Sequence, residues 1–274
     1  MTSAAVLVIG GGGKTGRRVS ERLRARGIAT RDVSRSTTPA FDWTEPKTWA
    51  AALDGVSKAY VTYQPDLAVD GATEAIATLS SLAKNKGLEH IVLLSGRGEP
   101  GAQRAEAALQ ASGVPWTVVR ASWFAQNFSE GYLVDGLLAG EIALPAGPVP
   151  EPFIDVDDIA DVAVAALTVP RHRNRLYEVT GPRALTFAQA VAEISAAVGR
   201  PIRYTQVAPD AFAEAMGPYV PKEIVDLLLD LFTVVLDGRN VNVMNGVQEA
   251  FGRPARDFSD YVRATAATGV WNVT

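Results

Sequence analysis

The sequence predicts an α/β protein built on a doubly wound parallel sheet. Apolar runs rich in β-branched residues alternate with helix-period segments through the first half of the chain, and glycines follow several of the helices. The first run, 5–9, is apolar on both faces, as expected for a central parallel strand that helices cover on both sides. Right-handed crossovers between such strands wind a sheet in two directions.

The strands and helices of the first half follow one repeating unit. The first strand, 5–9, leads into a helix over 15–26, which Gly27 ends as a left-handed cap. Gly87 and Gly113 follow two later helical segments in the same way. The remaining strands are expected at 28–34, 58–63, 90–94 and 115–120, and the remaining helices at 46–53, 70–86 and 101–112.

The second half of the chain is less regular. The proline-rich segment 145–152 breaks the pattern. Asp155, Asp157 and Asp158 then precede an apolar helix over 159–167, whose first-turn N–H groups they can satisfy. A short strand is expected at 177–180, a capping box at Thr186 and Gln189 opens a helix that ends at Gly199, and 208–236 is mostly helical.

These segments predict two parts of unequal size. Residues 1–150, with returns from 151–182, are expected to form the sheet domain. Residues 183–274 are expected to form mainly a smaller α/β substrate lobe that does not fold independently. From Asn127 onward we expect the chain to leave the sheet in excursions that build this lobe.

The composition excludes several classes of protein. The 274 residues carry 26 basic and 30 acidic side chains, and no Lys/Arg run that would suit nucleic acid or a membrane surface. Without cysteine, and with only His90 and His172 as histidines, the chain has no disulfide framework, no thiolate nucleophile and no expected metal site. No apolar run approaches the ~20 residues of a membrane span, and the start lacks a charged signal region, so a cytoplasmic protein is expected.

A glycine loop, Gly10-Gly11-Gly12-Gly13-Lys14-Thr15-Gly16, joins the first strand to the first helix. Its Gly-Lys-Thr end suggests a P-loop, but that motif needs a glycine where Val8 stands. The spacing of Gly10, Gly13 and Gly16 fits a dinucleotide loop instead, because glycines allow a tight turn, close approach of the pyrophosphate and close helix packing. The helix N-terminus, with the charge of Lys14, would hold the phosphates.

The end of the second strand indicates which dinucleotide binds. Arg35, flanked by Ser34 and Ser36, suits the 2′-phosphate of NADP, because a guanidinium binds phosphate bidentately. If the strand ends earlier, Asp32 favours NAD, since a carboxylate there binds the ribose hydroxyls. NADP is favoured and NAD is the alternative. The other interpretation of Arg35 is a solvated loop residue.

At these and other positions the chain resembles the NmrA-like family of atypical short-chain dehydrogenases/reductases. No single stretch is specific, but together they span residues 4 to about 205. The resemblance implies a Rossmann-type domain, NAD(P) bound at the carboxyl ends of the strands, and a small C-terminal substrate lobe. The stretches are the glycine loop with Arg35, 41–43, 50–56, 90–99, 106–120, 123–128, 153–161 and 177–182.

The resemblance also implies roles for particular residues. Gly10, Gly13 and Gly16 would hold the pyrophosphate, Arg35 the 2′-phosphate, and Asp42 would lie by the adenine. Other residues would lie around the nicotinamide and its reaction partner. Thr62, Tyr63 and Gln64 would line the cofactor cleft, Ser95 and Gly96 would lie beside the nicotinamide, and Trp123, Phe124 and Asn127 would lie over the substrate pocket.

The chain departs from its relatives where catalysis is concerned. The wider dehydrogenase group uses a Tyr-x-x-x-Lys pair to protonate the developing alkoxide, and this chain has no such pair. Some relatives keep a lysine four residues before the acid that matches Glu106, where this chain has Ala102. Arg120 is followed by Ala121 in place of the usual proline. A standard carbonyl-reductase mechanism is therefore not expected.

Hydride transfer to a flat, conjugated acceptor does not need that pair, because charge spreads over the acceptor and water can supply the proton. Ser95, Tyr63 and Arg97 are the catalytic candidates. Asp155 is a further candidate for the pocket, and its other interpretation is a helix cap. Aromatic side chains near the strand ends fit a flat substrate, with about half of them expected in the core: Tyr63, Trp123, Phe124, Phe128, Tyr132 and Phe153.

The sequence thus predicts an NAD(P)H-dependent oxidoreductase of secondary metabolism that reduces a quinone, an enone or an aromatic polyketide-like molecule. Its partner is a small-molecule substrate, and a homodimer is left open. The alternative is an NADP-binding redox sensor without turnover. A sensor needs a protein-binding surface, for which the apolar segment 224–236 is the candidate. The other interpretation of that segment is a lobe helix packed on the core.

Overall fold

The computed structural model describes residues 4–273 and divides them into two compact units. Each unit has its own buried apolar core. Unit 1 contains the described residues up to Ala121 together with Val156–Val179 and Gly246–Arg253, and unit 2 contains Ser122–Asp155, Thr180–Asn245 and the described residues from Pro254 on.

Unit 1 is built on a six-stranded sheet in which all neighbouring strands are parallel. The strand order is β2-β1-β3-β4-β5-β7, which confirms the predicted doubly wound α/β class. The strands are β1 (Ala5–Ile9), β2 (Thr30–Val33), β3 (Val56–Val61), β4 (His90–Gly96), β5 (Trp116–Ala121) and β7 (Arg175–Val179).

The sheet changes its winding direction at β1. The strand β2 lies on one side of β1, whereas β3 and the later strands lie on the other. The carboxyl ends of β1 and β3 therefore flank a topological switch point, where open α/β sheets leave a crevice for ligands. The glycine loop 10–16 and Thr62 directly follow these two strand ends.

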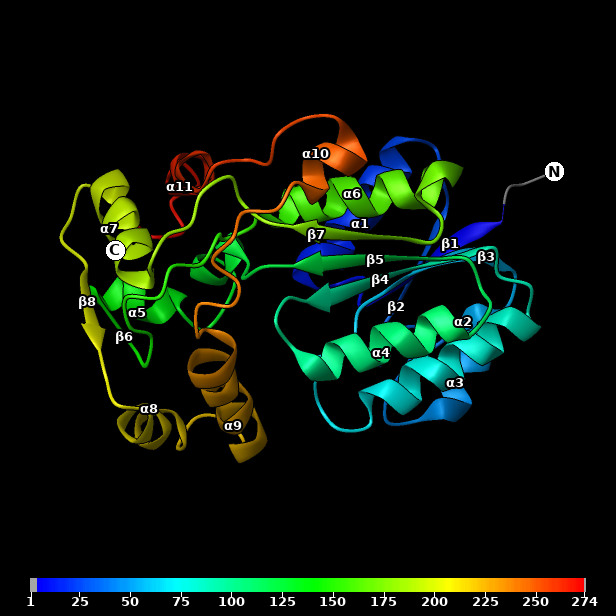
Figure 1. The fold of residues 1–274 in the computed structure, drawn as a ribbon, viewed down its shortest axis with the longest axis horizontal. Coiled ribbons are helices and arrows are strands. Elements are labelled where there is room, and N and C mark those ends of the chain that lie inside the picture. Colours follow the sequence, from blue (N-terminus) through cyan, green and yellow to red (C-terminus); the bar gives the residue numbers. More distant parts are fainter. Residues whose placement is uncertain (1–3, 274) are drawn as a thin grey trace. The chain divides into compact units, whose positions relative to one another are not determined.

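Helices cover both faces of the sheet (Figure 1). One face carries α1 (Lys14–Ala25) packed with α6 (Val156–Thr168), and the other carries α3 (Ala72–Asn85) packed with α4 (Pro100–Ala111). This double cover explains why β1 is apolar on both sides. Gly27, Gly87 and Gly113 have positive φ at the helix ends, as predicted. Shorter elements of unit 1 are η1 (Pro46–Thr48), α2 (Trp49–Leu53) and η3 (Pro170–His172).

The helix α6 begins at Val156 and not at residue 159, so Asp157 and Asp158 lie in its first turn and not ahead of it. Two forces favour this position. Acidic side chains in a first turn interact well with the helix dipole. In addition, Asp157 accepts a hydrogen bond of 2.5 Å from Nη2 of Arg22 on α1, which joins the two helices.

Unit 2 combines short helices with a two-stranded parallel sheet. The predicted capping box is confirmed, because the Thr186 hydroxyl accepts from the Gln189 N–H and the Gln189 side chain accepts from the Thr186 N–H. Its elements are η2 (Ala125–Phe128), α5 (Val134–Ala139), β6 (Glu141–Leu144), α7 (Phe187–Val198), β8 (Arg203–Gln206), α8 (Pro209–Met216), α9 (Lys222–Asp230), a π-helical turn η4 (Leu231–Val235) and α11 (Phe258–Ala266).

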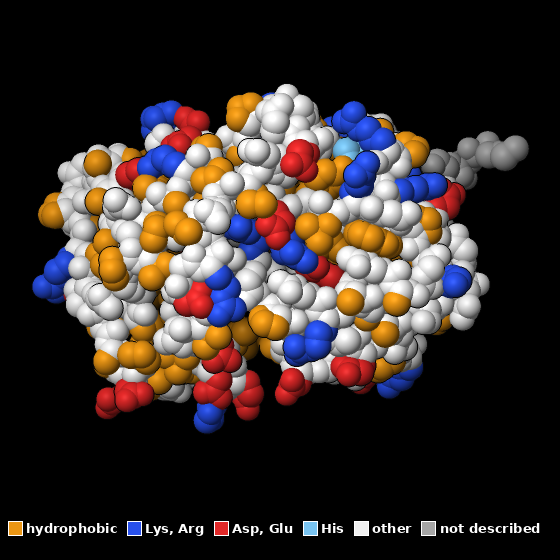
Figure 2. Space-filling model, in the orientation of Figure 1, with side chains coloured by type: hydrophobic (Ala, Val, Ile, Leu, Met, Phe, Trp, Pro, Cys, Tyr) orange, Lys and Arg blue, Asp and Glu red, His pale blue; other side chains and the backbone are white. Residues whose placement is uncertain are grey.

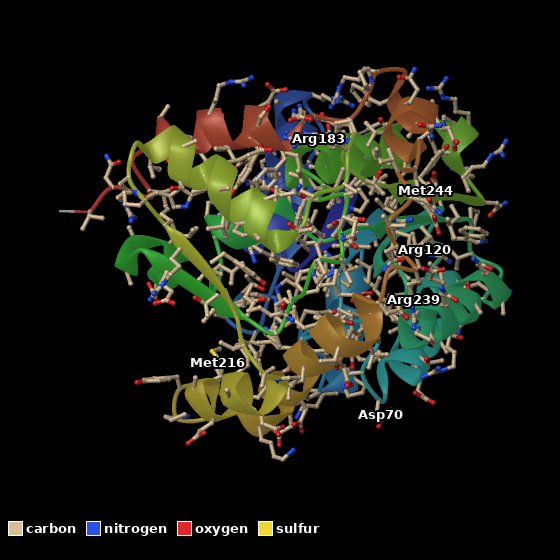
Figure 3. The ribbon with its side chains drawn as sticks, turned by 60° about the vertical axis from the view of Figure 1, so that its left-hand side comes forward. Asp70, Arg120, Arg183, Met216, Arg239 and Met244 are labelled. Atoms are coloured by element: carbon tan, nitrogen blue, oxygen red, sulfur yellow. The ribbon has the colours of Figure 1, made fainter. Side chains whose placement is uncertain are left out.

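Aromatic side chains and one arginine hold unit 2 together. Phe153 and Phe187 lie with ring centroids 5.0 Å apart at the centre of its core. Arg183, labelled in Figure 3, forms bidentate hydrogen bonds with Glu193 on α7 and with Asp257, the residue that caps α11. The segment 224–236, which the sequence left open as a partner surface, packs its apolar face on this core through Leu228, Phe232 and Leu236.

The observed units differ from the predicted division. Residues 122–155 belong to unit 2, so the first stretch of the sheet domain ends with β5 and not at residue 150, and the chain returns to the sheet over Val156–Val179 and not over 151–182. Residues 246–253 return to unit 1, where α10 (Gly246–Phe251) packs on α6 and β7. Hydrophobic periodicity locates a short helix in the sequence, but it does not tell which of two cores the helix joins.

Candidate functional site

The glycine loop is shaped by contacts that leave no room for a side chain at several of its positions. A Cβ on Gly16 would lie 2.2 Å from the carbonyl oxygen of Gly10, and a Cβ on Gly10 would lie 2.3 Å from Oγ1 of Thr62. The Gly13 N–H donates to the Gly10 carbonyl at 2.9 Å and closes the turn. Gly10 has φ of 79°, which favours glycine. These contacts bring together Gly10, Gly13, Gly16 and Thr62.

The loop opens α1 in a way that suits a diphosphate. Gly13 is the N-cap of α1 and has no side chain to accept from the N–H groups of the first turn, which contains Lys14, Thr15 and Gly16. The first turn also carries no acidic side chain. A helix end of this kind, with a lysine in its first turn, attracts anions. The residues present therefore fit the pyrophosphate of a dinucleotide.

Asp32, the residue that favoured NAD, is engaged inside unit 1. Its carboxylate accepts hydrogen bonds of 2.7 Å from the Ser20 hydroxyl and from Nη2 of Arg24, both on α1. Its Cβ lies so close to the loop that a Cβ on Gly11 would be only 2.6 Å away. Asp32 thus positions the glycine loop, and its two oxygens already have donors.

Arg35 lies in the exposed turn that follows β2. Ser34 and Ser36 flank it, with their hydroxyl oxygens 3.2 Å apart, and Oγ1 of Thr37 accepts from the Ser34 N–H. Asp42 lies nearby, and its pKa is lowered by hydrogen bonds from the backbone and hydroxyl of Thr44, with a smaller contribution from Arg35. A guanidinium and two hydroxyls at one strand end form a suitable receptor for a phosphate monoester.

An aromatic group lines the region between the ends of β2 and β3. The indole N–H of Trp43 donates to the Thr62 carbonyl at 3.1 Å. Its ring lies 4.6 Å from that of Tyr63 and 4.9 Å from that of Phe41. Tyr63 is half-buried, and burial raises the pKa of its hydroxyl. Gln64, the next residue, is exposed.

The end of β4 carries Ser95, Gly96 and Arg97, two of which are tied to acids. Ser95 is buried, and its hydroxyl donates to Oε1 of Glu106 at 2.5 Å. Arg97 is also buried and lies with Nε 3.7 Å from Oε2 of Glu178, so it is not a solvated loop residue. The Ser95 hydroxyl is thus engaged within unit 1.

Arg120, labelled in Figure 3, binds both Glu106 and Glu178 near the carboxyl ends of the strands. It forms a bidentate pair with Glu106 and donates from Nη1 to Oε1 of Glu178 at 2.8 Å. The pair of Arg120 with Glu106 joins the end of β5 to α4, and its bond to Glu178 joins β5 to β7. An arginine held by two carboxylates keeps this strand edge rigid.

The sequence pattern predicts no role for Glu99, although this residue lies in the stretch 90–99 that resembles the NmrA-like family. Glu99 is buried directly after β4, beside the predicted nicotinamide residue Gly96. The signal in the sequence was an acid three residues after Gly96 and directly before Pro100, a residue that typically starts a helix. Asp66, the acid nearest to Glu99, was likewise not singled out.

The predicted substrate residues belong to unit 2 and fall into two groups. Trp123, Phe124 and Asn127 are half-buried, and the Trp123 ring lies 5.0 Å from that of Phe232. Phe128, which was predicted to line the substrate pocket, and Phe153 are instead buried in the core of unit 2, with ring centroids 5.6 Å apart. Tyr132 is exposed, and Asp155 is buried and accepts from Nε2 of Gln126 at 2.7 Å.

The sequence predicts no metal site, no membrane span and no nucleic-acid surface. Residues 4–273 contain no group of three or more His, Asp or Glu side chains arranged to hold a metal ion. No helix within the same residues has the length and apolarity to cross a membrane. On the face drawn in Figure 2, Lys and Arg side chains do not gather into one large patch.

Comparison with known proteins places these features in a family. Residues 103–261 match the NmrA-like family. The NAD(P)H azoreductase of Xenophilus azovorans is 34% identical, and the match covers 96% of this chain and 98% of the relative. The (4-alkanoyl-5-oxo-2,5-dihydrofuran-3-yl)methyl phosphate reductase of Streptomyces griseus is 32% identical, and the match covers 93% of this chain and 96% of the relative.

A solved structure shows the same fold. The NADPH-dependent quinone oxidoreductase QOR2 of Escherichia coli, crystallised with NADPH, matches with a TM-score of 0.79 at 21% identity. The match covers 94% of this chain and 99% of that chain. Together with the match to residues 103–261 and the 34% identity to a full-length relative, this agreement shows that the chain belongs to the NmrA-like family.

Proposed function

We propose that this protein is an NAD(P)H-dependent oxidoreductase that reduces a flat, conjugated small molecule by direct hydride transfer. The observation that carries the proposal is the loop around Gly10, Gly13 and Gly16, where the absence of a side chain at Gly10 and Gly16 is a steric requirement at the N-terminus of α1. The names of two relatives described above, an NAD(P)H azoreductase and a (4-alkanoyl-5-oxo-2,5-dihydrofuran-3-yl)methyl phosphate reductase, support the reaction class.

NADP(H) is the proposed cofactor, with NAD(H) as the alternative. The glycine loop and the first turn of α1 would hold its pyrophosphate, and Arg35 with Ser34 and Ser36 would hold the 2′-phosphate. Asp32 does not favour NAD as strongly as its position suggested, because Ser20 and Arg24 already donate to its two oxygens. When bound, the cofactor would supply a hydride.

The side chains that surround such a site position the reactants and do not activate a hydroxyl. The chain lacks a Tyr-x-x-x-Lys pair, and the Ser95 hydroxyl donates to Glu106. Acceptors that suit this chemistry delocalise the charge that hydride transfer creates. Trp123 and Phe124, which the family resemblance assigns to the substrate, are half-buried aromatic side chains of unit 2. A cytoplasmic location and a homodimer stay predictions.

The experiment that tests the function follows NADPH and NADH oxidation by absorbance in the presence of quinones, azo dyes, flavin and enones. We expect turnover with at least one planar acceptor and faster oxidation of NADPH than of NADH. Tight binding of NADPH without turnover of any acceptor would refute the reductase and favour the alternative, a redox sensor that binds NADP without catalysis.

A further inference from the structure

A buried carboxyl group lies at the carboxyl end of β4 without full hydrogen bonding. Glu99 is only 8% exposed, and its Oε2 has no hydrogen-bond partner within residues 4–273. The other oxygen, Oε1, lies so close to the backbone of Gly96 that a Cβ there would be 2.3 Å away. Glycine at position 96 therefore leaves the space that this carboxyl group occupies. A buried polar atom left unpaired costs free energy, so its retention calls for an explanation.

A second carboxyl group accompanies it. Asp66 lies in the loop after β3, where its Oδ1 accepts from the Ala68 N–H at 2.7 Å. This loop lies against the start of α4, since a Cβ on Gly101 would be 2.2 Å from the Ala68 carbonyl oxygen. The close approach places Asp66 next to Glu99. Two adjoining carboxyl groups do not readily ionise together.

These surroundings determine which acid keeps its proton. Burial raises the pKa of Glu99 to about 9, with further contributions from Asp66 and from Glu106 on α4. The charge of Glu106 is offset by Arg120, whereas Oδ1 of Asp66 accepts from the backbone N–H of Ala68. Glu99 is therefore a protonated carboxylic acid at neutral pH, and its pKa suits proton donation near that pH.

The topology places this acid at the reacting half of the proposed cofactor. The glycine loop after β1 would hold the pyrophosphate, and Arg35 after β2 would hold the adenosine half on one side of β1. The other half of the dinucleotide then crosses the carboxyl ends of β3 and β4, on the opposite side of β1. Thr62, Gly96 and Glu99 follow those two strands.

We propose that Glu99 is the general acid of this reductase and that Asp66, whose loop lies against the start of α4, is a positioning residue for it. The inference rests on the proposed function. Reduction of an enone adds a hydride and a proton to the substrate. The O–H bond of Glu99 breaks as its proton passes to the substrate, and the resulting carboxylate regains a proton from water. Glu99 would thus take the part that tyrosine plays in the wider dehydrogenase group.

The test uses Glu99→Gln, which keeps the shape of the side chain but has no acidic proton. Two acceptors are compared with NADPH as reductant: an enone, which needs a proton, and a triarylmethane cation, which becomes neutral on accepting hydride alone. We expect enone reduction to slow by roughly 10²-fold, while reduction of the cation and the Kd for NADPH stay unchanged. Glu89→Gln, at an exposed acid that follows α3, is the matched control and should change none of these values.

A readout without cofactor examines the acid itself. Infrared spectra of the protein alone should show a protonated carboxyl band at pH near 7 that Glu99→Gln removes. Asp66→Asn should move the titration of this band to lower pH. In the wild type, enone reduction should fall as pH rises through about 9, and Asp66→Asn should move this fall to lower pH as well.

The outcomes separate the inference from the function on which it rests. Equal losses with the enone and with the cation would assign Glu99 a structural role and overturn the inference alone. An ionised Glu99 at neutral pH in an active enzyme would do the same. Absence of turnover by the wild type with every acceptor would overturn the proposed function, and the general acid with it.

Discussion

The Ser95 hydroxyl donates a 2.5 Å hydrogen bond to Oε1 of Glu106, so the serine at the end of β4 is held by an acid on α4. The same carboxyl group forms a bidentate pair with Arg120, whose Nη1 reaches Glu178 on β7. The buried Glu106 thus connects β4 and β5 to α4 at the carboxyl ends of the strands, where the cofactor is proposed to bind. Ser95 is a member of this network.

Glu106→Gln should therefore destabilise unit 1 more than it alters cofactor contacts. The amide keeps the size of the side chain but replaces a charged acceptor of Arg120 with a neutral one. We expect a loss of about 1.5–3 kcal/mol in the free energy of unfolding, the range for a hydrogen bond to a charged group, measured by urea denaturation. Ser95→Ala removes only the serine bond and leaves the pair of Arg120 with Glu106 in place, so it should cost less than Glu106→Gln. Equal stability of wild type and Glu106→Gln would contradict the network.

The fold and the glycine loop could be predicted because their signals are local. The run 5–9 is apolar on both faces, glycines follow the helices, and the spacing of Gly10, Gly13 and Gly16 directly reflects backbone contacts within seven consecutive residues. The capping box at Thr186 and Gln189 was predictable for the same reason, since both partners lie within one helical turn.

Features that depend on distant partners were not predictable. The strands β6 and β8 have four residues each and pair only with one another across about 60 residues, so no local pattern marks them. The hydrogen bonds that Asp32 accepts come from Ser20 and Arg24 on the preceding helix. Likewise, Glu99 becomes unusual only through the approach of the loop that carries Asp66.

A matched pair of alanine substitutions tests the glycine loop. A Cβ on Gly16 would lie 2.2 Å from the Gly10 carbonyl oxygen, so Gly16→Ala must displace the turn that would hold the pyrophosphate. A Cβ on Gly12 meets nothing within 4 Å, so Gly12→Ala leaves the turn in place. We expect Gly16→Ala to abolish NADPH binding in fluorescence titrations and Gly12→Ala to retain it. Similar Kd values for the two variants would refute the steric role of Gly16.

Arg35→Ala tests the preference for NADP. If the guanidinium binds the 2′-phosphate, its removal should weaken NADPH binding by about 1.5–3 kcal/mol, as for a hydrogen bond between charged groups, and leave NADH binding unchanged. The exposed Arg26, at the end of α1, provides a control of the same charge, and Arg26→Ala should affect neither cofactor. Calorimetric titration of NADPH and of NADH into the wild type and both variants gives the change in Kd of each variant for each cofactor. Equal losses for NADPH and NADH would remove the assignment of Arg35 to the 2′-phosphate.

The buried histidine His90 should make the protein less stable in mild acid. The Thr117 hydroxyl donates to the His172 carbonyl at 2.6 Å, so at 2.8 Å from Oγ1 the Nε2 of His90 is the donor. Burial lowers the pKa of His90 from 6.5 to about 4. Between these two values the unfolded chain binds a proton that the folded protein does not, so the free energy of unfolding falls as pH falls through this window.

His90→Gln removes this titration but keeps an N–H donor for Thr117. Urea unfolding at several pH values should therefore show a smaller loss of stability below pH 6.5 for the variant than for the wild type. Part of the slope should remain, because burial also lowers the pKa of His172. Identical pH dependence of wild type and variant would show that His90 is not the group that titrates.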